Sequence, residues 1–304
     1  FAAHCVDDLA PSAYDGNSRG NRAQVGYTTD ATFGRTNLRN WLFGQDFLVP
    51  AGDGRTTVSS TMVWYDPRSR FGSESDLSSG AFLPADIALA GFSTPTEILG
   101  RDAQNGIGLL FSQVNGMVPV TIGGYGTSGN GLTGARTAGT AEESFFRRLG
   151  QNVVDFLGDE RTLSIGIYGQ ATGDILDPNG LRYQDLYWLD FDNPNFATQP
   201  FSSSVTRTAS NTLDYNTLGG RAVAGEAITG SGDSGSPLLT SAFGRDVSLG
   251  VLSQGSRLFF DAVGNPNDNF VFGQAFSNYG SLAGYNPLFL YWDQIFINNP
   301  YKYV

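Results

Sequence analysis

The chain has 304 residues, of which 40% are hydrophobic, so it can fill one large folded core or two smaller ones. Its formal net charge is −11 and its sequence pI is about 4.4. Such an acidic surface argues against nucleic acid and anionic membranes as partners. No apolar run is long enough to span a membrane. The 40 glycines and the scarcity of helical periodicity favour an all-β protein with many turns.

The first third of the chain combines polar loops with short apolar segments. Residues 45–49 are expected to form a short strand, and residues 57–65 a second one, because apolar side chains alternate along them. Residues 95–106 are expected to link two domains, which span residues 1–104 and 105–304. This part therefore predicts a small β-domain followed by a larger one.

The larger domain carries several strand patterns and one helical pattern. Strands are expected at residues 118–122, 163–168, 186–191 and 247–252, and hairpins around residues 177–180 and 264–269. Residues 147–156 fit either a helix or a strand. Residues 287–298 have apolar side chains at helical spacing and end before Pro300, which predicts a C-terminal helix.

No metal or cofactor is expected from the motifs. The acidic turn at residues 174–179 lacks the ligand spacing and closing glutamate of a calcium-binding loop. The glycine-rich residues 123–134 are not followed by the lysine and helix of a phosphate-binding loop.

The stretch from Gly230 to Pro237, with sequence Gly-Ser-Gly-Asp-Ser-Gly-Ser-Pro, is a glycine-punctuated loop with Ser234 at its centre. Glycines permit backbone angles that other residues forbid, so the loop can expose the Ser234 hydroxyl. The same loop can turn the N–H groups of Gly232 and Ser234 toward one point. A nucleophile beside two such donors is the arrangement that attack on a carbonyl group requires.

A serine hydroxyl needs a base near neutral pH, and the base is usually histidine. The chain has one histidine, His4, in the stretch Ala-Ala-His-Cys. A carboxylate that could orient this imidazole is Asp86, in the stretch Asp-Ile-Ala-Leu. The order of histidine, aspartate and serine is one of several found for such triads on unrelated folds.

Together these three motifs resemble trypsin/chymotrypsin-like serine proteases, except that Ser236 replaces a commoner glycine. The resemblance implies two antiparallel six-stranded β-barrels, long loop insertions and a C-terminal helix. It also implies that Gly123–Gly126 opens the second barrel and that residues 147–156 form a strand. The implied activity is that of a secreted serine endopeptidase acting on a protein or peptide substrate.

The resemblance assigns further roles around Ser234. Ile228 would form the floor of the primary specificity pocket, and the substrate-binding wall would be Ser253, Gln254 and Gly255. An isoleucine there favours cleavage after small or medium apolar residues rather than basic ones. In the family, the carboxylate before the serine pairs with an ammonium group freed by cleavage. Phe1 lies only three residues before His4, so Asp233 is expected to need another partner.

The N-terminal region departs from the family pattern, since only three residues precede His4. The first barrel is therefore expected to lack its N-terminal strands and to be completed by an upstream fragment. Cys5, the single cysteine, is either a residue that has lost its partner or, as we favour, a small buried core residue. The Gly/Asn/Ser/Thr-rich composition also resembles that of the protease segment of bacterial autotransporter passengers. That likeness suggests a secreted or bacterial cell-surface protein, and the alternative function is a catalytically silent, protease-fold binding or structural module.

Overall fold

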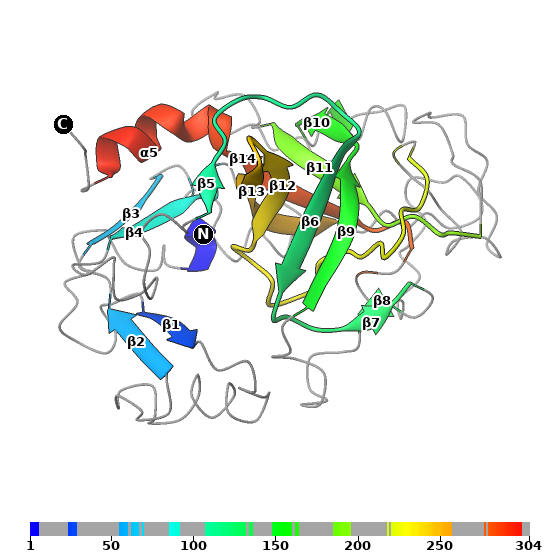
Figure 1. Ribbon diagram of the computed structural model, residues 1–304, viewed down its shortest axis with the longest axis horizontal. Coiled ribbons are helices and arrows are strands. Elements are labelled where there is room, and N and C mark those ends of the chain that lie inside the picture. Colours follow the sequence, from blue (N-terminus) through cyan, green and yellow to red (C-terminus); the bar gives the residue numbers. More distant parts are fainter. Residues whose placement is uncertain are drawn as a thin grey trace, which may run out of the picture.

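The structure is a computed structural model of the chain. It describes residues 1–5, 24–28, 55–59, 62–66, 69, 85–91, 107–131, 134–135, 148–159, 162–163, 185–195, 218, 220–256, 277 and 279–299. The described part is mostly β-sheet and has one short C-terminal α-helix, which confirms the predicted all-β class. Its strands form one curled sheet of eight strands and three sheets of two strands (Figure 1).

The curled sheet contains most of the second half of the chain. Its strands are β5 (Gly108–Leu109), β6 (Val118–Gly124), β9 (Arg148–Val154), β10 (Phe156–Gly158), β11 (Leu186–Asp190), β12 (Pro237–Ala242), β13 (Arg245–Ser256) and β14 (Leu282–Pro287). The order is β10-β11-β14-β13-β12-β6-β9, and β5 joins β13 in parallel. Only Asp155 separates β9 from β10, so the two ends of this order are adjacent in the chain. The sheet consequently curls into a half-barrel around a buried apolar cluster that includes Val120, Leu238 and Tyr285.

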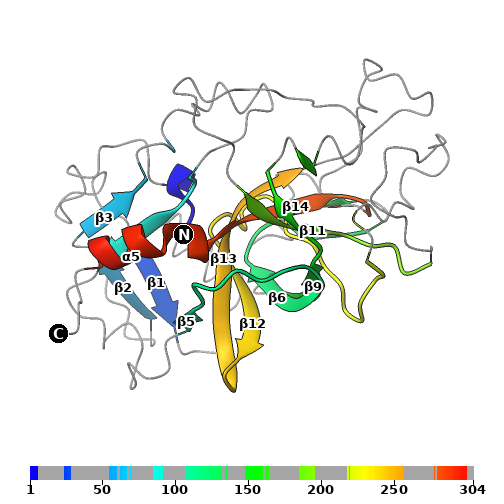
Figure 2. The same cartoon turned by 90° about the horizontal axis from the view of Figure 1, so that it is seen from above.

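The three small sheets are two-stranded and antiparallel. β1 (Gln24–Thr28) pairs with β2 (Arg55–Ser59), β3 (Met62–Tyr65) pairs with β4 (Ala88–Gly91), and β7 (Gly129–Asn130) pairs with β8 (Gly134–Ala135). Figures 1 and 2 both show β1 to β4 on one side of the molecule, with the N-terminal turn η1 (Ala3–Cys5), and most of the curled sheet on the other.

The C-terminal segment packs the two sides together. A 3-10 turn, η6 (Leu288–Tyr291), leads into the helix α5 (Trp292–Asn298). Side chains of this segment form one buried cluster with Ile87, which precedes β4, and with Val251 of β13. The contact is central to the candidate site, because Ile87 directly follows Asp86.

Several sequence predictions are confirmed by these elements. The strands predicted at residues 118–122, 186–191 and 247–252 are β6, β11 and β13. Within the ambiguous residues 147–156, Arg148–Val154 form β9 and Phe156 starts β10. The predicted C-terminal helix is present as η6 followed by α5.

Two strand predictions need correction. Residues 57–65 do not form one strand, because β2 ends at Ser59 and β3 starts at Met62, and each pairs with a different partner. Leu163, the expected start of the strand at residues 163–168, is helical, and residues 164–168 lie outside the described residues. Side-chain alternation cannot show where a chain leaves one sheet for another. The strand at 45–49, the linker at 95–106 and the hairpins around 177–180 and 264–269 lie outside the described residues.

Candidate active site

His4 and Asp86, which are 82 residues apart, are joined by two hydrogen bonds. The His4 Nδ1 atom lies 2.8 Å from Asp86 Oδ2, and the His4 backbone N–H donates to Asp86 Oδ1 at 2.8 Å. The Asp86 side chain is fully buried, whereas the His4 side chain is 27% exposed. The imidazole is thus anchored at its inner nitrogen by a carboxylate.

The turn that carries His4 is held against β4. Phe1 and Ala88 exchange both backbone hydrogen bonds, with N–O distances of 3.1 and 2.7 Å, as residues in an antiparallel ladder do. Ala2 and Ala3 are completely buried, and the small side chain of Ala3 packs against Val63 and Tyr65. This packing brings His4 to Asp86.

Asp86 is also held by two residues from the other side of the molecule. The Ser253 hydroxyl donates to Asp86 Oδ2 at 2.7 Å, and the Asn286 side-chain amide donates to the Asp86 carbonyl oxygen at 2.7 Å. Ser253 is the extra residue where the register of β13 against β14 shifts between Leu252 and Gln254. A bulge of this kind redirects a side chain, and here the redirected side chain reaches the carboxylate. Our sequence analysis missed both roles and placed Ser253 on a substrate-binding wall.

The surroundings of His4 favour its protonated form. The side-chain hydrogen bond to Asp86 is the largest cause, and a smaller contribution comes from Cys5. They raise the pKa of His4 from 6.5 to about 10, against the opposing effect of burial. Cys5 itself is exposed, so the expectation of a buried core cysteine is wrong. The buried positions of this turn are taken by Ala2 and Ala3.

Ser234 is exposed on the loop between Gly230 and β12. Gly232 and Gly235, on either side of it, have φ angles of 94° and 82°, a region that favours glycine. A Cβ atom on Gly235 would lie 3.1 Å from both the Ala2 nitrogen and the Phe1 Cβ atom. The loop therefore lies directly against the segment that carries His4.

Among the described residues, Ser234 and His4 form no direct hydrogen bond with each other. In unliganded enzymes such bonds are often long and tighten only when substrate binds. The structure thus brings His4 to Asp86 by direct contact, and it places Gly235, which follows Ser234 in the chain, against residues 1 and 2.

The backbone N–H groups of this loop fall into two sets. Those of Gly230, Asp233, Gly235 and Ser236 all donate hydrogen bonds within the loop or to β13. Those of Ser231, Gly232 and Ser234 have no acceptor within the part of the chain that the structure describes. The two donors predicted for an oxyanion, Gly232 and Ser234, belong to the second set. Such N–H groups can donate hydrogen bonds to an oxygen atom on which negative charge develops during a reaction.

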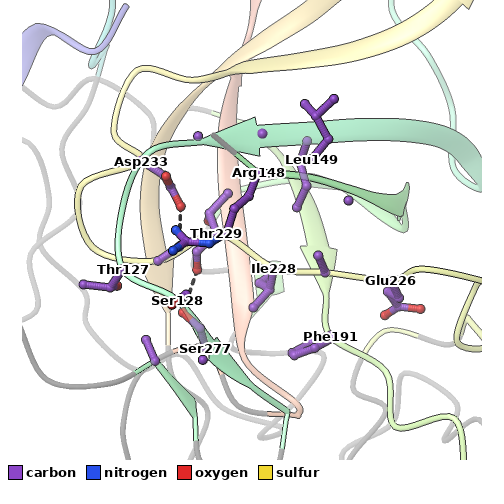
Figure 3. Close-up of a pocket in the computed structure, with 18 of the residues that line it drawn as sticks. Thr127, Ser128, Arg148, Leu149, Phe191, Glu226, Ile228, Thr229, Asp233 and Ser277 are labelled. Atoms are coloured by element: carbon purple, nitrogen blue, oxygen red, sulfur yellow. Dashed lines mark hydrogen bonds between the residues drawn. The ribbon is translucent and has the colours of Figure 1, made fainter. Parts of the chain in front are cut away.

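A pocket of about 310 Å³ is lined in part by Gly230 and Asp233 of this loop (Figure 3). Ile228, Thr229 and Asp233 line one wall, and Arg148 and Leu149 of β9 line another. Neither His4 nor Ser234 lines the pocket. Of the residues expected to bind substrate, only Ile228 lines this pocket. The other three, Ser253, Gln254 and Gly255, are on β13 and do not line it.

Four carboxyl groups gather where the β9–β10 junction meets β11: Asp155, Asp190, Asp192 and Glu226. The Asp190 N–H donates to Asp155, and the Asp192 N–H donates to Glu226 at 2.6 Å. Burial, followed by repulsion from Asp190, raises the pKa of Asp155 to about 10 and that of Asp192 to about 8. Burial also raises the pKa of Glu226 to about 7. The carboxyl groups of Asp155, Asp192 and Glu226 are therefore held in their protonated forms to unusually high pH.

The stability of the fold should fall as the solution becomes alkaline. A carboxyl group whose pKa is raised by folding stabilises the folded state fully below its unfolded pKa near 4, and this stability is lost as pH rises through its folded pKa. We expect the thermal unfolding midpoint to be at least roughly 4 °C lower at pH 9 than at pH 5. The Asp192→Asn variant should reduce this difference, and the exposed control Asp246→Asn should not. An equal midpoint at both pH values would contradict the expectation.

The sequence matches no model of a known protein family and shows no significant similarity to any curated protein. The resemblance to trypsin/chymotrypsin-like proteases therefore rests on the three short motifs. Within the described ranges, no group of three or more His, Cys, Asp or Glu side chains is arranged to hold a metal ion. No helix among the described residues is both long and apolar enough to cross a membrane.

Proposed function

We propose that this protein is a serine endopeptidase that uses His4, Asp86 and Ser234 as its catalytic triad. The observation that carries the proposal is the pair of hydrogen bonds between His4 and the fully buried Asp86. A buried carboxylate on the inner nitrogen of a partly exposed imidazole is what a histidine base requires. The exposed Ser234 hydroxyl beside two unpaired N–H groups adds the nucleophile and the oxyanion donors.

In the proposed reaction, Ser234 Oγ attacks the peptide carbonyl carbon while His4 takes the hydroxyl proton. The oxyanion of the tetrahedral intermediate accepts hydrogen bonds from the Gly232 and Ser234 N–H groups. His4 then donates its proton to the leaving amine, and the peptide bond breaks. Water, activated by His4, hydrolyses the resulting acyl-enzyme. Asp86 keeps Nδ1 protonated and stabilises the imidazolium ion throughout.

The proposed fold is that of chymotrypsin-type proteases, with barrels in residues 1–104 and 105–304. Six strand units of the curled sheet support the second barrel: β6, β9–β10, β11, β14, β13 and β12, all paired antiparallel to one another. The continuity of β9 and β10 through Asp155 is the feature expected of a sheet that closes.

The proposed specificity is for small or medium apolar side chains before the cut. It rests on Ile228, which offers no charge to pair with lysine or arginine. A peptide library that varies only the residue before the cut should give the highest kcat/KM for alanine, valine or leucine. A clear preference for arginine or lysine would show that Ile228 does not form the floor of the specificity pocket.

The rival function is a binding or structural module that keeps the protease fold but does not cleave. To distinguish this module from an endopeptidase, an unfolded test protein is incubated with the wild type, and the products are analysed by mass spectrometry. The proposed endopeptidase should produce internal cuts, each adding one water across the two fragments. A module would leave the protein intact. A secreted or cell-surface location follows from the family resemblance and is proposed with it.

A further inference from the structure

Asp86, the residue that anchors His4, lies in a strained turn. Ala85, which precedes it, has a φ angle of 57°, in the left-handed region that residues other than glycine rarely occupy. The Ile87 N–H donates to the Ala85 carbonyl at 2.7 Å, which closes a three-residue turn with Asp86 in the middle. Strained backbone persists only where its surroundings hold it in place. The contacts that hold this turn therefore also hold the carboxylate of the proposed triad.

One hydrogen bond from the other side of the molecule holds the middle of this turn. Asn286, a fully buried residue of β14, donates from Nδ2 to the Asp86 carbonyl oxygen at 2.7 Å. Among the described residues, no other donor reaches that carbonyl. A peptide unit is planar, so holding its oxygen fixes the orientation of the whole unit that joins Asp86 to Ile87.

The packing around this hydrogen bond is apolar. Ala85 and Ile87 belong to a buried cluster that includes Val251 and Leu288. Apolar packing is not directional, whereas a hydrogen bond to a carbonyl group is. Within the described part of the chain, the Oδ1 atom of Asn286 has no hydrogen-bond partner. A buried amide that leaves its oxygen unpaired is costly, so the role of this amide lies in its NH₂ group.

β13 and β14 each hold Asp86 at a different atom. Ser253 donates to the carboxylate at Oδ2, and Asn286 donates to the backbone carbonyl oxygen. The carboxylate must also meet His4 twice, with Oδ1 at the backbone N–H and Oδ2 at Nδ1. An aspartate side chain has only two rotatable bonds, so the orientation of its backbone limits where the two oxygens can lie.

We propose that Asn286 is a positioning residue, which holds the backbone of Asp86 so that its carboxylate meets His4 with both oxygens. Asn286 acts through Asp86 and not on the substrate. This inference rests on the proposed function of the triad. It adds to that triad a supporting residue 200 positions away from Asp86 in the chain.

The spectroscopic test uses the single histidine of the chain, because the imidazole NMR signals of a protein without a polyhistidine tag must then come from His4. Asn286→Leu keeps a side chain of similar volume but removes the donor. The Asp86 carboxylate should be less well aligned in this variant, and the pKa of His4 should be roughly one unit lower than in the wild type. Asn152→Leu is the matched control, because Asn152 is also buried and its amide donates to two other backbone carbonyl groups. The control should keep the wild-type pKa of His4.

The kinetic test uses the same Asn286→Leu variant. A misplacement of about 1 Å, caused by a mutation remote from the chemistry, can cost about 10² in rate. We expect kcat to fall roughly 10- to 100-fold, with KM within about threefold of the wild type, because the substrate contacts are unchanged.

A wild-type pKa of His4 in folded Asn286→Leu, or wild-type kcat in that variant, would overturn the inference. An equal fall of this pKa in Asn152→Leu would also overturn it, because general loosening of the fold would then explain both results. If the wild type hydrolyses no peptide but the pKa of His4 still falls in Asn286→Leu alone, the proposed function fails and the positioning role of Asn286 stands. Should Asn286→Leu not fold, Asn286→Ala is titrated in its place, and the same outcomes decide.

Discussion

Ser234→Ala should reduce kcat for peptide hydrolysis by about 10⁶-fold, the loss expected when a triad nucleophile is removed. The fold should be unchanged, because the Ser234 side chain is exposed and accounts for none of the hydrogen bonds of the described residues. The measurement is turnover of a peptide substrate by purified protein, with circular dichroism and thermal unfolding as checks of the fold. Ser231→Ala, an exposed serine of the same loop, is the matched control and should retain activity.

If Ser234→Ala kept wild-type turnover, the nucleophile would lie elsewhere in the chain. If Ser234→Ala and Ser231→Ala lost activity equally, disruption of the loop rather than loss of the hydroxyl would explain the result.

Asp86→Asn should reduce kcat by about 10⁴-fold, because an amide favours the wrong tautomer of the His4 imidazole. In the wild type, Asp86 accepts hydrogen bonds from the His4 N–H, the His4 Nδ1–H and the Ser253 hydroxyl. An amide cannot accept all three, so its NH₂ group must face at least one donor.

The same substitution should change the pH dependence of the residual activity. Only neutral His4 can act as a base, so wild-type kcat/KM should rise with pH above neutrality, toward the raised pKa of about 10. Without the carboxylate, the pKa of His4 should fall, and the rise should occur at lower pH. Pre-steady-state rates at each pH, with unfolding monitored in parallel, provide the measurement. An unchanged pH profile in Asp86→Asn would contradict the assigned partner of His4.

The motifs could be predicted from sequence because each is local. His4 is the only histidine, and Ser234 is surrounded by the glycines that its loop needs. A few neighbouring residues were therefore enough to predict catalytic roles for His4 and Ser234. The strands β6, β11 and β13 were predictable for the same reason, since alternation or a short apolar run lies within each of them.

The support of the site could not be predicted, because it depends on contacts distant in sequence. Asn286 reaches Asp86 across 200 residues, and Ser253 reaches it across 167. Ser253 does so from a bulge, and the position of a register shift cannot be predicted from the alternation of side chains in the sequence. The Asp233 carboxylate accepts hydrogen bonds from the N–H groups of Gly230, in its own loop, and of Gly126, 107 residues away. The second of these contacts was missed in the same way.

The central claim is that Ser234 is an activated nucleophile, and covalent labelling tests it most directly. The folded wild type should react with a fluorophosphonate probe, gaining one phosphonyl group per chain, and fragment-ion mapping should place this group on Ser234. Ser234→Ala should gain none, and Asp86→Asn should react far more slowly. Absence of labelling in the folded wild type, or labelling at another residue, would contradict the account.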